Sequence, residues 1–401
     1  MTIINGERLL KDLRDLAQYG KCGTGVNRPA FSDDDLAARE WIMGRLESAG
    51  LTATVDRYGN VYGEARGASS AVLIGSHTDT VPEGGWLDGA MGVMYALEIT
   101  RARREQGEGG VEVISFMDEE GTYLPFLGSR AFCGMLPNQE WEEAKGPRGS
   151  SLGDVIRERW SRTRPVQLDR NRYVAYLEAH VEQGPRLEAA NRRIGIVTGI
   201  VGMHRYRVSV IGQADHAGTT PMAMRRDAGM VLIAIARTIA EVFPKHASAD
   251  TVWNIGSIAF APGVSNVVPA GATMTVEYRD TNQSTLEKFG EVLYEITAAH
   301  AKHTGLPVDT SVITQVEPVA MDPLLAETIA ASTRHHGETP MLMPSGAGHD
   351  AQVVAKFLPT AMLLVPSIGG RSHTVVEDTN KADIVLGCQV LADATDRILA
   401  R

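Results

Sequence analysis

The chain has 401 residues and a formal net charge of −10, from 39 basic and 49 acidic side chains. This length predicts about two domains, and the acidic balance argues against a nucleic-acid partner, which requires clustered basic charge. No apolar run approaches the roughly eighteen residues of a membrane span, and the N-terminus lacks the apolar core of a signal peptide. The three cysteines are widely spaced and odd in number, which fits reduced thiols. We therefore expect a cytoplasmic globular protein without a membrane or nucleic-acid partner.

The first half of the chain alternates short apolar runs with helical patterns. Apolar runs bounded by glycine-rich turns are typical of buried parallel strands, and they occur at residues 72–74, 111–116 and 173–177. A helix is expected at residues 88–106, between the first two runs. This order of strand, helix and strand predicts an α/β domain, in which ligands gather at the carboxyl ends of the strands.

The order of the predicted strands and helices changes near residue 205 and returns to the earlier pattern after residue 316. The expected order in this middle part is strand, helix, strand, strand, helix and strand, at residues 205–210, 226–243, 252–260, 272–280, 284–304 and 308–316. That order, βαββαβ, defines the split-βαβ ferredoxin-like unit. Afterwards a helix, a strand and a helix follow at residues 322–335, 361–365 and 383–399. We therefore predict an α/β sheet domain, residues 1–199 and 317–401, with an inserted ferredoxin-like α+β domain, residues 200–316.

Side chains that bind metals follow two of the predicted strands. His77 ends the first run and Asp88 comes eleven residues later, while Glu119 and Glu120 follow the second run. Zinc takes imidazole and carboxylate ligands, and one carboxylate can bridge two ions, a role that suits Asp88. Asp79 is placed to accept the other imidazole N–H of His77. Of two consecutive glutamates, one can bind metal while the other stays free as a general base.

Each of these elements also has an ordinary structural explanation. A single histidine at a strand end is more often a hydrogen-bonded residue than a ligand, glutamate pairs are mostly solvated, and Asp-Gly is usually a turn. Two further histidines favour the metal site, because His180 follows the run 173–177 and His373 follows the run 361–365. Together, and in this order, the residues indicate a metal centre at the edge of the sheet.

With these residues the chain resembles the M20-type metallo-amidases of the hydantoinase/carbamoylase family. That group includes N-carbamoyl-L-amino acid hydrolases, β-ureidopropionases, and allantoate and ureidoglycolate amidohydrolases. The matching motifs are long and cover most of the chain: GSHTDTVPEGGWLDGAMGV, LGSRAFCG, LEAHVEQGP, GQADHAGTTPMAMRRDA, PGVSNVVPA, EYRD, MPSGAGHDAQ and SIGGRSHT. The resemblance implies hydrolysis of a linear amide C–N bond, above all in an N-carbamoyl amino acid, which would give the amino acid, CO2 and ammonia. Allantoate and ureidoglycolate are the alternative substrates.

The resemblance also implies a role for each site residue. Two divalent metal ions, of zinc, manganese, cobalt or nickel, would be held by His77, Asp88, Glu120, His180 and His373. Glu119 would be the general base, and Asp79 would hydrogen-bond to a metal ligand without binding metal itself.

Four more residues are implied to contact the substrate. Gln183 would face it, His216 would stabilise the oxyanion, and Asn266 and Arg279 would hold a substrate carboxylate, which suits the planar guanidinium fork. Taken alone, Arg279 is more readily explained as a surface salt bridge. The inserted domain is implied to be a lid and dimerisation domain, so the protein would be a homodimer, with His216 acting in its own subunit or in the partner's.

The segment after the glutamate pair departs from the family pattern. Relatives read like EEGSRFxxxxLGSR there, whereas this chain has EEGTYLPFLGSR, which is two residues shorter. Thr122 and Tyr123 replace Ser-Arg, and the bulky 124–126 stretch is expected to shape a pocket for an apolar or aromatic substrate. Two other functions stay open: an N-acyl amino acid amidase or dipeptidase, and a catalytically inactive binding protein, although no metal ligand is missing.

Overall fold

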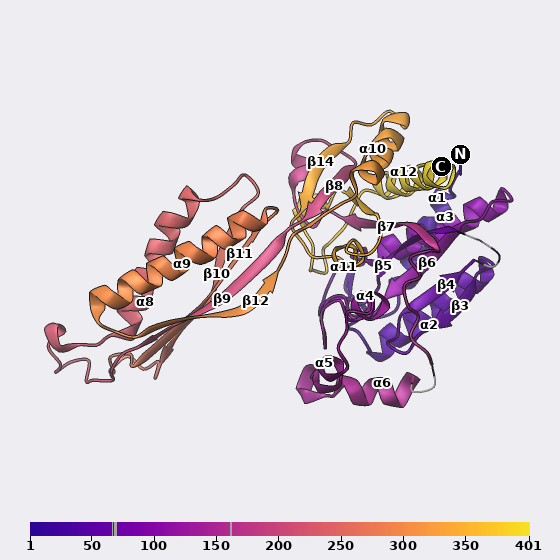
Figure 1. Ribbon diagram of the computed structural model, residues 1–401. Coiled ribbons are helices and arrows are strands. Elements are labelled where there is room, and N and C mark those ends of the chain that lie inside the picture. The colour runs from indigo at the N-terminus through magenta and orange to yellow at the C-terminus, as the bar shows by residue number, and fades with distance from the viewer. Residues whose placement is uncertain (66, 68–69, 161–162) are drawn as a thin grey trace. The chain divides into compact units, whose positions relative to one another are not determined.

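The structure is a computed structural model, and it describes residues 1–65, 67, 70–160 and 163–401 (Figure 1). The chain forms two compact units. Unit 1 comprises 1–198 and 320–401, and unit 2 is the continuous segment 199–319. Each unit has its own sheet and its own apolar core. A mixed α/β fold with an inserted α+β unit was expected from the sequence, and the order of the elements confirms it.

Within the described residues, the larger sheet has nine strands in the order β13-β8-β15-β7-β5-β6-β4-β3, with β14 paired to β8. The strands are β3 Thr52–Val55, β4 Val61–Glu64, β5 Ala71–His77, β6 Val111–Phe116, β7 Tyr173–Val181, β8 Gly195–Ile200, β13 Val319–Ala320, β14 Met341–Ser345 and β15 Thr360–Val365. The central strands β15, β7, β5 and β6 run parallel. They are almost wholly buried, which explains their continuous apolar sequences. Their carboxyl ends meet at one edge of the sheet.

Helices cover this sheet and complete the core of unit 1. α3, Ala90–Glu105, contacts β5, β6 and β7 and is buried along almost its whole length. α1, Gly6–Leu16, and α12, Lys381–Leu399, contact α3 and each other. α2, Asp33–Ser48, covers β3 and β4, and α10, Pro323–His335, contacts α12 and β15. α3 therefore carries its N-terminal residues directly to the sheet edge where the predicted ligands lie.

A smaller apolar cluster lies around three short helices, α4 Leu127–Phe132, α5 Asn138–Glu143 and α6 Leu152–Trp160. Its members include Phe31, Met117 and Trp141. α11, Asp350–Val354, contacts α4 together with β5, β7 and β15. This cluster anchors the segment that follows the glutamate pair.

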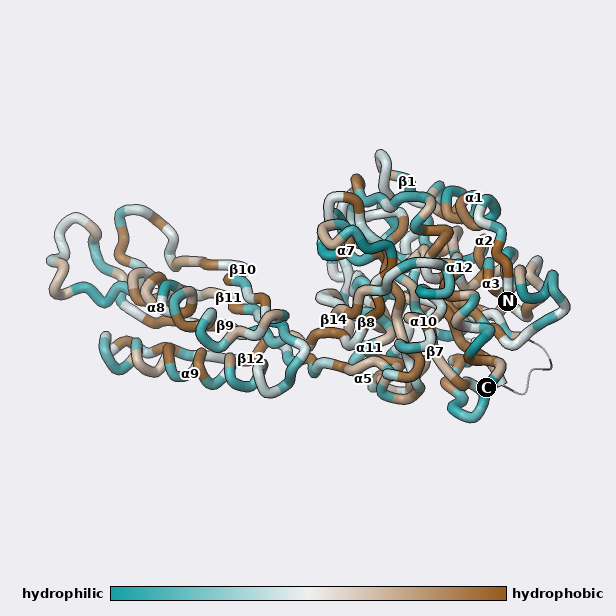
Figure 2. The backbone as a smooth tube through the Cα atoms, turned by 90° about the horizontal axis from the view of Figure 1, so that it is seen from above, coloured by the Kyte–Doolittle hydropathy of each residue, from teal (hydrophilic) through white to brown (hydrophobic). Residues whose placement is uncertain are grey.

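Unit 2 has a four-stranded antiparallel sheet in the order β10-β11-β9-β12, counted within the described residues. Its elements are β9 Gly202–Ile211, α8 Ala228–Val242, β10 Val252–Ala261, β11 Gly271–Asp280, α9 Gln283–Thr304 and β12 Val308–Val316. Burial alternates along β9 and β11, so one face of the sheet is covered, and α8 and α9 contribute the other half of this core. Along α9 the buried apolar residues recur between hydrophilic ones, as the colours of Figure 2 show. None of the helices in the described parts of the chain is long and apolar enough to cross a membrane.

Candidate metal centre and active site

The predicted metal ligands of unit 1 come together at the carboxyl edge of its sheet. His77 is the last residue of β5, His180 lies at the end of β7, and Glu119 and Glu120 follow β6. His373 lies in the segment after β15, with a backbone φ of 53°. Left-handed backbone is costly for a residue with a side chain, about 1–3 kcal/mol, so the surrounding structure must hold this histidine in place.

Asp88 reaches the site from the start of α3. The next residue, Gly89, is the N-cap of this helix and has a φ of 63°. A Cβ atom at Gly89 would lie 2.4 Å from the Nε2 atom of His77, so only glycine allows the helix to start so close to the imidazole. The Asp-Gly turn therefore has a specific function: it lets a carboxylate and an imidazole face each other at the sheet edge.

The ligand atoms form two groups that share Asp88. His77 Nε2 lies 3.7 Å and His180 Nε2 3.1 Å from Asp88 Oδ1. His373 Nε2 lies 3.3 Å from Asp88 Oδ2 and 3.5 Å from Glu120 Oε1. Within each group one ligand atom per residue lies within 4.8 Å of the others. Each of these groups could hold a divalent cation, and Asp88 would contribute to both.

The charges in this cluster shift several pKa values. Burial alone would raise the pKa of Asp88, but its contacts with His180 and His373 outweigh this effect and hold that pKa well below its usual value. The contact with Asp88 raises the pKa of His373 to about 9. Burial opposes the charged form of His180, yet the same contact raises its pKa to about 9. Burial and the charge of Asp88 raise the pKa of Glu120 to about 8.

Divalent cations fit this donor set. The carboxyl groups of Asp88, Glu119 and Glu120 are close together, and burial with mutual repulsion raises the pKa of Glu119 well above its usual value. Among the described residues, the buried Oε1 atom of Glu120 has no hydrogen-bond partner. A cation would satisfy that oxygen and offset the repulsion. The residues therefore suit two dications, one beside His77 and His180 and the other beside Glu120 and His373.

The backbone and neighbouring side chains fix the orientation of the ligands. The Nδ1 atom of His77 lies 3.0 Å from the backbone carbonyl oxygen of Asp79, and the Nδ1 atom of His180 lies 2.9 Å from that of Val181. The sequence suggested the Asp79 carboxylate for the first contact. That carboxylate instead accepts the backbone N–H of Glu120 at 3.2 Å, because the chain turns after β5 and presents its carbonyl group to the imidazole.

The structure adds three buried residues that sequence reasoning did not single out. Glu377 accepts hydrogen bonds from the backbone N–H groups of Leu87 and Asp88, at 3.1 and 3.0 Å. The ring of His349 lies against the ring of His180, with centroids 4.5 Å apart, and Asp350 is fully buried next to it. His349 and Asp350 belong to the GAGHDAQ motif, which was a usable signal, whereas nothing in the sequence pointed to Glu377.

Gln183 also faces the ligands. It has a φ of 60°, and its Nε2 atom lies 3.2 Å from both Asp88 Oδ2 and His373 Nε2. The amide oxygen of Gln183 is buried and has no hydrogen-bond partner in the described chain. An unsatisfied oxygen beside the ligands can accept a hydrogen bond from a bound N–H group.

The three predicted substrate residues of unit 2 do not lie together. His216 and Asn266 are neighbours, because Ala217 N donates to Asn266 O at 3.0 Å and His216 pairs with Val267 in an isolated bridge. Arg279 is at the other end of β11, opposite Met203. The stretch of strand from Gly271 to Arg279 spans about 27 Å at the usual rise per residue. Arg279 and His216 therefore occupy opposite ends of one sheet.

Comparisons with known proteins give a consistent result. Residues 73–397 match the model of Peptidase family M20/M25/M40. An N-carbamoyl-L-amino-acid amidohydrolase of Paenarthrobacter aurescens is 32% identical over 398 residues, which is 96% of each chain. An allantoate amidohydrolase of Escherichia coli is 33% identical over 377 residues, or 92% of each chain. A solved amidase of the hydantoinase/carbamoylase family from Burkholderia phymatum is 43% identical, with a TM-score of 0.93 over 100% of this chain and 99% of that one.

The chain belongs to peptidase family M20/M25/M40. Among the M20 proteins its relatives are amidohydrolases, and it is itself an amidohydrolase of the hydantoinase/carbamoylase type. The enzyme keeps a full set of ligand-type residues in one place. A catalytically inactive binding protein is therefore not the explanation of this chain.

The shortened segment of this M20 amidohydrolase is held by Asp118. That residue has a φ of 57°, and its carboxylate accepts the backbone N–H groups of Thr122, Tyr123 and Leu124. The ring of Tyr123 packs edge-on against Phe31, so this side chain joins the smaller apolar cluster. Leu124 packs against the same cluster.

Phe126 is the member of the shortened segment that lies nearer to the ligands. A Cβ atom added at Gly348 would lie 2.8 Å from its Cζ atom, and Gly348 directly precedes His349. The Phe126 ring is half-buried. Of the bulky residues, it is the one that lies beside the segment leading into His349.

Proposed function

We propose that this M20 amidohydrolase cleaves the ureido C–N bond of an N-carbamoyl amino acid and releases the amino acid, CO2 and ammonia. The observation that carries the proposal is the sharing of Asp88 between two ligand groups, with the free carboxyl group of Glu119 beside them. The substrate class is supported by the relatives named N-carbamoyl-L-amino acid amidohydrolase, which match the chain over almost its whole length.

Glu119 is the general base of the proposed reaction. Its Oε2 atom lies 3.6 Å from His77 Nε2, and among the described residues Glu119 belongs to neither ligand group, so this oxygen is available to a water molecule. Bound dications would lower the pKa of water and polarise the scissile carbonyl group. Glu119 would take the proton at Oε2 and then deliver it to the leaving nitrogen.

Three side chains of unit 2 are proposed to bind and orient the substrate. Arg279 would hold the carboxylate through its planar fork, and its guanidinium is already oriented by Glu277, to which Nε donates at 2.9 Å. His216 would stabilise the oxyanion, a contribution worth about 3–4 kcal/mol for a single donor. Asn266, which lies beside His216, would hold the substrate carboxylate together with Arg279.

The distance between Arg279 and His216 favours a site completed by two subunits. A small ureido acid cannot reach both ends of a strand about 27 Å long. We propose that one subunit supplies Arg279 and its partner supplies His216 and Asn266.

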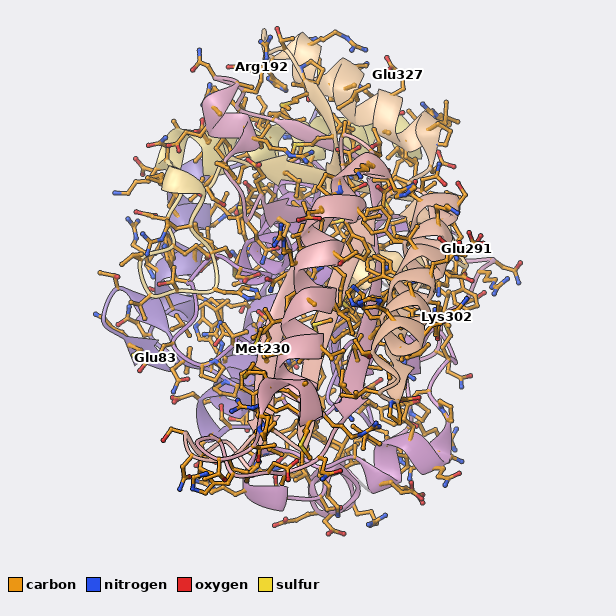
Figure 3. The ribbon with its side chains drawn as sticks, turned by 90° about the vertical axis from the view of Figure 1, so that its left-hand side faces the viewer. Glu83, Arg192, Met230, Glu291, Lys302 and Glu327 are labelled. Atoms are coloured by element: carbon orange, nitrogen blue, oxygen red, sulfur yellow. The ribbon has the colours of Figure 1, made fainter. Side chains whose placement is uncertain are left out.

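The protein would then be a homodimer that associates through unit 2. β10 is an edge strand of ten residues on which Val252, Ile258 and Phe260 are exposed. Met230 on the neighbouring α8 is 61% exposed, and its position on this helix is labelled in Figure 3. A long exposed apolar edge strand is a template for pairing with a second chain.

Zinc, manganese, cobalt and nickel all suit these ligands, and affinity order alone does not select one. We propose that two such ions bind and that the enzyme works in the cytoplasm, where its three unpaired cysteines would stay reduced.

A substrate panel tests the activity. The metal-loaded enzyme would be incubated with N-carbamoyl amino acids, N-carbamoyl-β-alanine, allantoate, ureidoglycolate and an N-acyl amino acid, and ammonia release would be measured. Highest kcat/KM on an N-carbamoyl amino acid supports the proposal. If the enzyme prefers allantoate or ureidoglycolate, the proposed substrate is wrong but the proposed hydrolysis of a ureido C–N bond stands. Cleavage of the N-acyl amino acid alone would exclude a ureido substrate.

Mixed dimers test whether the site is shared. Glu119→Gln and His216→Ala are each expected to be inactive, but co-expression would place an intact Glu119 and an intact His216 in one site of the mixed dimer. If random pairing occurs, about a quarter of wild-type activity should return. Activity that stays at the level of the single variants would show that both residues act within one subunit.

A further inference from the structure

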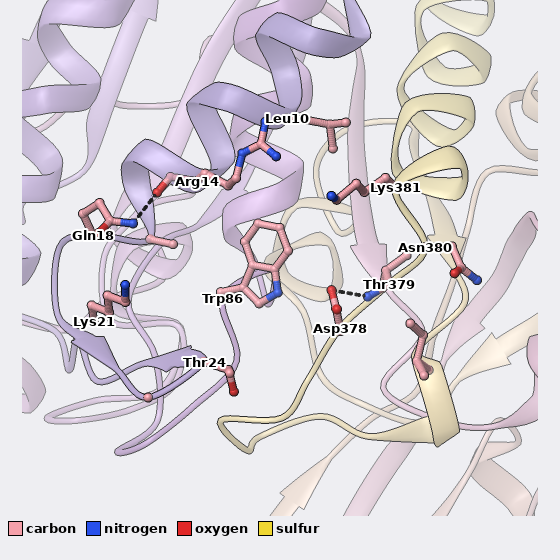
Figure 4. Close-up of a pocket in the computed structure, with 14 residues that line it drawn as sticks. Leu10, Arg14, Gln18, Lys21, Thr24, Trp86, Asp378, Thr379, Asn380 and Lys381 are labelled. Atoms are coloured by element: carbon pink, nitrogen blue, oxygen red, sulfur yellow. Dashed lines mark hydrogen bonds between the residues drawn. The ribbon is translucent and has the colours of Figure 1, made fainter.

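Unit 1 contains a cavity of about 620 Å³ that none of the six predicted metal-site residues lines (Figure 4). Its walls come from α1, the hairpin at residues 21–26, Trp86, and the segment that leads into α12. Asp88 and Glu377 are neighbours in sequence of the lining residues Trp86 and Asp378, but both are buried and neither lines the cavity. The volume is within the range of small-molecule sites, about 300–1,000 Å³. The cavity is therefore separate from the metal centre.

The charges around this cavity are opposite to those of the whole chain. Arg14, Lys21 and Lys381 line it, against the single acid Asp378, in a protein with a net charge of −10. None of these three cations has an acidic partner within 4.0 Å among the described residues, whereas Arg8 and Arg45, near the same helix, are both paired. Figure 4 draws the side chains of Arg14 and Lys381 on the same side of the Trp86 ring. Unpaired cations that converge on a cavity favour an anion.

The uncharged part of the lining combines apolar residues, among them Leu10, Trp86 and Ile368, with polar ones. Trp86 is half-buried, and Figure 4 shows its ring among the side chains that line the cavity. An indole face stacks with flat rings at a centroid separation of about 4.5–7 Å. The cavity therefore combines a surface for a ring with cations for an acidic group.

The walls of this cavity are connected to the metal centre through the backbone. Trp86 is two residues before Asp88, and Asp378 follows Glu377, whose carboxylate accepts from the N–H groups of Leu87 and Asp88. The hairpin is tied to the same loops, since Val26 N donates to Gly84 O at 3.0 Å. A ligand that contacts both Trp86 and Lys381 would bridge the two segments that Glu377 holds together.

We propose that this cavity binds a small organic anion that carries a flat ring, and that its binding holds Asp88 in the position required for metal binding. The ring would stack on Trp86, and its carboxylate or phosphate would lie between Arg14 and Lys381. Because the two segments are linked at Glu377, binding of the anion and binding of metal reinforce each other. This inference does not depend on the identity of the substrate.

Calorimetric titration of the metal-loaded enzyme tests the binding. The probes are 2-naphthoate and 2-naphthyl phosphate, which distinguish a carboxylate from a phosphate, with 2-naphthamide and acetate as ligands that lack the charge or the ring. We expect one of the two anions to bind with one site per chain and the amide and acetate to bind at least about tenfold more weakly. Equal binding of 2-naphthamide would overturn the proposal.

Variants locate the site. Arg14→Glu and Lys381→Glu should each lower the affinity for the anion by about tenfold or more. Trp86→Phe should lower this affinity only in part. Lys11→Glu, on the exposed side of the same helix, is the matched charge control and should bind as the wild type does. Arg279→Ala should also bind the anion as the wild type does. If Arg279→Ala loses the anion while Lys381→Glu still binds it, the anion binds at the substrate site and the proposed cavity site is wrong.

A second measurement tests the coupling. The metal dissociation constant, measured against a chelator, should fall by about fivefold or more when the bound naphthyl anion is present, and this change should vanish in Lys381→Glu. Binding of the anion without any change in metal affinity would overturn the link to Asp88.

Discussion

Glu377 accepts a hydrogen bond from the backbone N–H of Asp88 at 3.0 Å, and from that of Leu87 at 3.1 Å. It lies 289 residues along the chain from Asp88. A Cβ atom at Gly85 would lie 2.0 Å from the same carboxylate, so glycine is required for this close approach. Burial, with the charge of Asp88, raises the pKa of Glu377 to about 7. The position of the shared carboxylate thus depends on a residue that belongs to neither ligand group.

Replacing Glu377 should therefore loosen the metal centre. Glu377→Ala removes both acceptor contacts, and we expect metal affinity to fall by about tenfold or more, the usual scale for residues that support ligands. Glu377→Gln keeps an acceptor oxygen and should have a smaller effect. Chelator competition would measure the affinity, with Asp378→Asn as the neighbouring control. Because the role is positioning, excess metal should restore most of the kcat of Glu377→Ala; an equal loss of kcat at all metal concentrations would contradict this role.

Glu119→Gln should separate proton transfer from metal binding. The amide has almost the same shape but cannot take a proton, so we expect kcat to fall by about a hundredfold or more, with metal content unchanged. Elemental analysis and ammonia release are the measurements. Glu142→Gln, at an exposed position, is the control. Near-normal turnover of the Glu119 variant would show that another group is the base.

Removal of the metals should make stability depend on pH. In the folded, metal-free chain the pKa of Glu120 is about 8, whereas its ordinary value is 4.5. The pKa values of His180 and His373 are about 9 in the folded chain, compared with an ordinary value of 6.5. A raised folded-state pKa contributes stability at low pH that is lost as the pH rises through the folded value. We therefore expect the Tm of the metal-free protein to fall between pH 6 and 9, by about 3 °C or more.

Metal binding should reverse this trend, because it displaces protons and becomes more favourable as the pH rises. Thermal unfolding at several pH values, with and without manganese or zinc, would measure both effects. EDTA should abolish activity, and a divalent metal should restore it. Activity that survives confirmed metal removal, or a metal-free Tm that rises with pH, would contradict this account.

Arg279 should determine preference for a free acid. Arg279→Ala removes a charged bidentate contact, and Arg279→Lys should also fail because an ammonium group cannot form the planar fork. We expect kcat/KM on the acid to fall by several kcal/mol in transition-state terms, with metal content unchanged.

The test is a substrate whose carboxylate is converted to an amide. The wild type should process it poorly, and Arg279→Ala should treat the acid and the amide alike. Arg205→Ala is the matched control, since Arg205 also pairs with Glu277. If Arg279→Ala still prefers the acid by the wild-type margin, Arg279 is a structural salt-bridge residue.

Local sequence patterns were sufficient for most of the fold. The strand at 111–116 and the strand at 308–316 begin and end where they were predicted, because buried runs and alternating runs follow from the geometry of a strand. The helix predicted at 88–106 begins instead at Ala90, after the Asp88-Gly89 turn. That difference matters, because it leaves Asp88 free of the helix and directed at the histidines.

The sequence by itself determined which residues of this protein can bind metal and that they follow parallel strands, since both properties depend on residue type and on neighbours along the chain. Tertiary structure decided what those residues contact. The hydrogen bond from Asp88 N–H to Glu377, the contact between the His349 and His180 rings and the cationic cavity beside Trp86 all join segments that are distant in sequence. The register of β9 and β11 likewise places Arg279 and His216 at opposite ends of a sheet. Such contacts arise when the chain packs and its loops close, and no local periodicity encodes them.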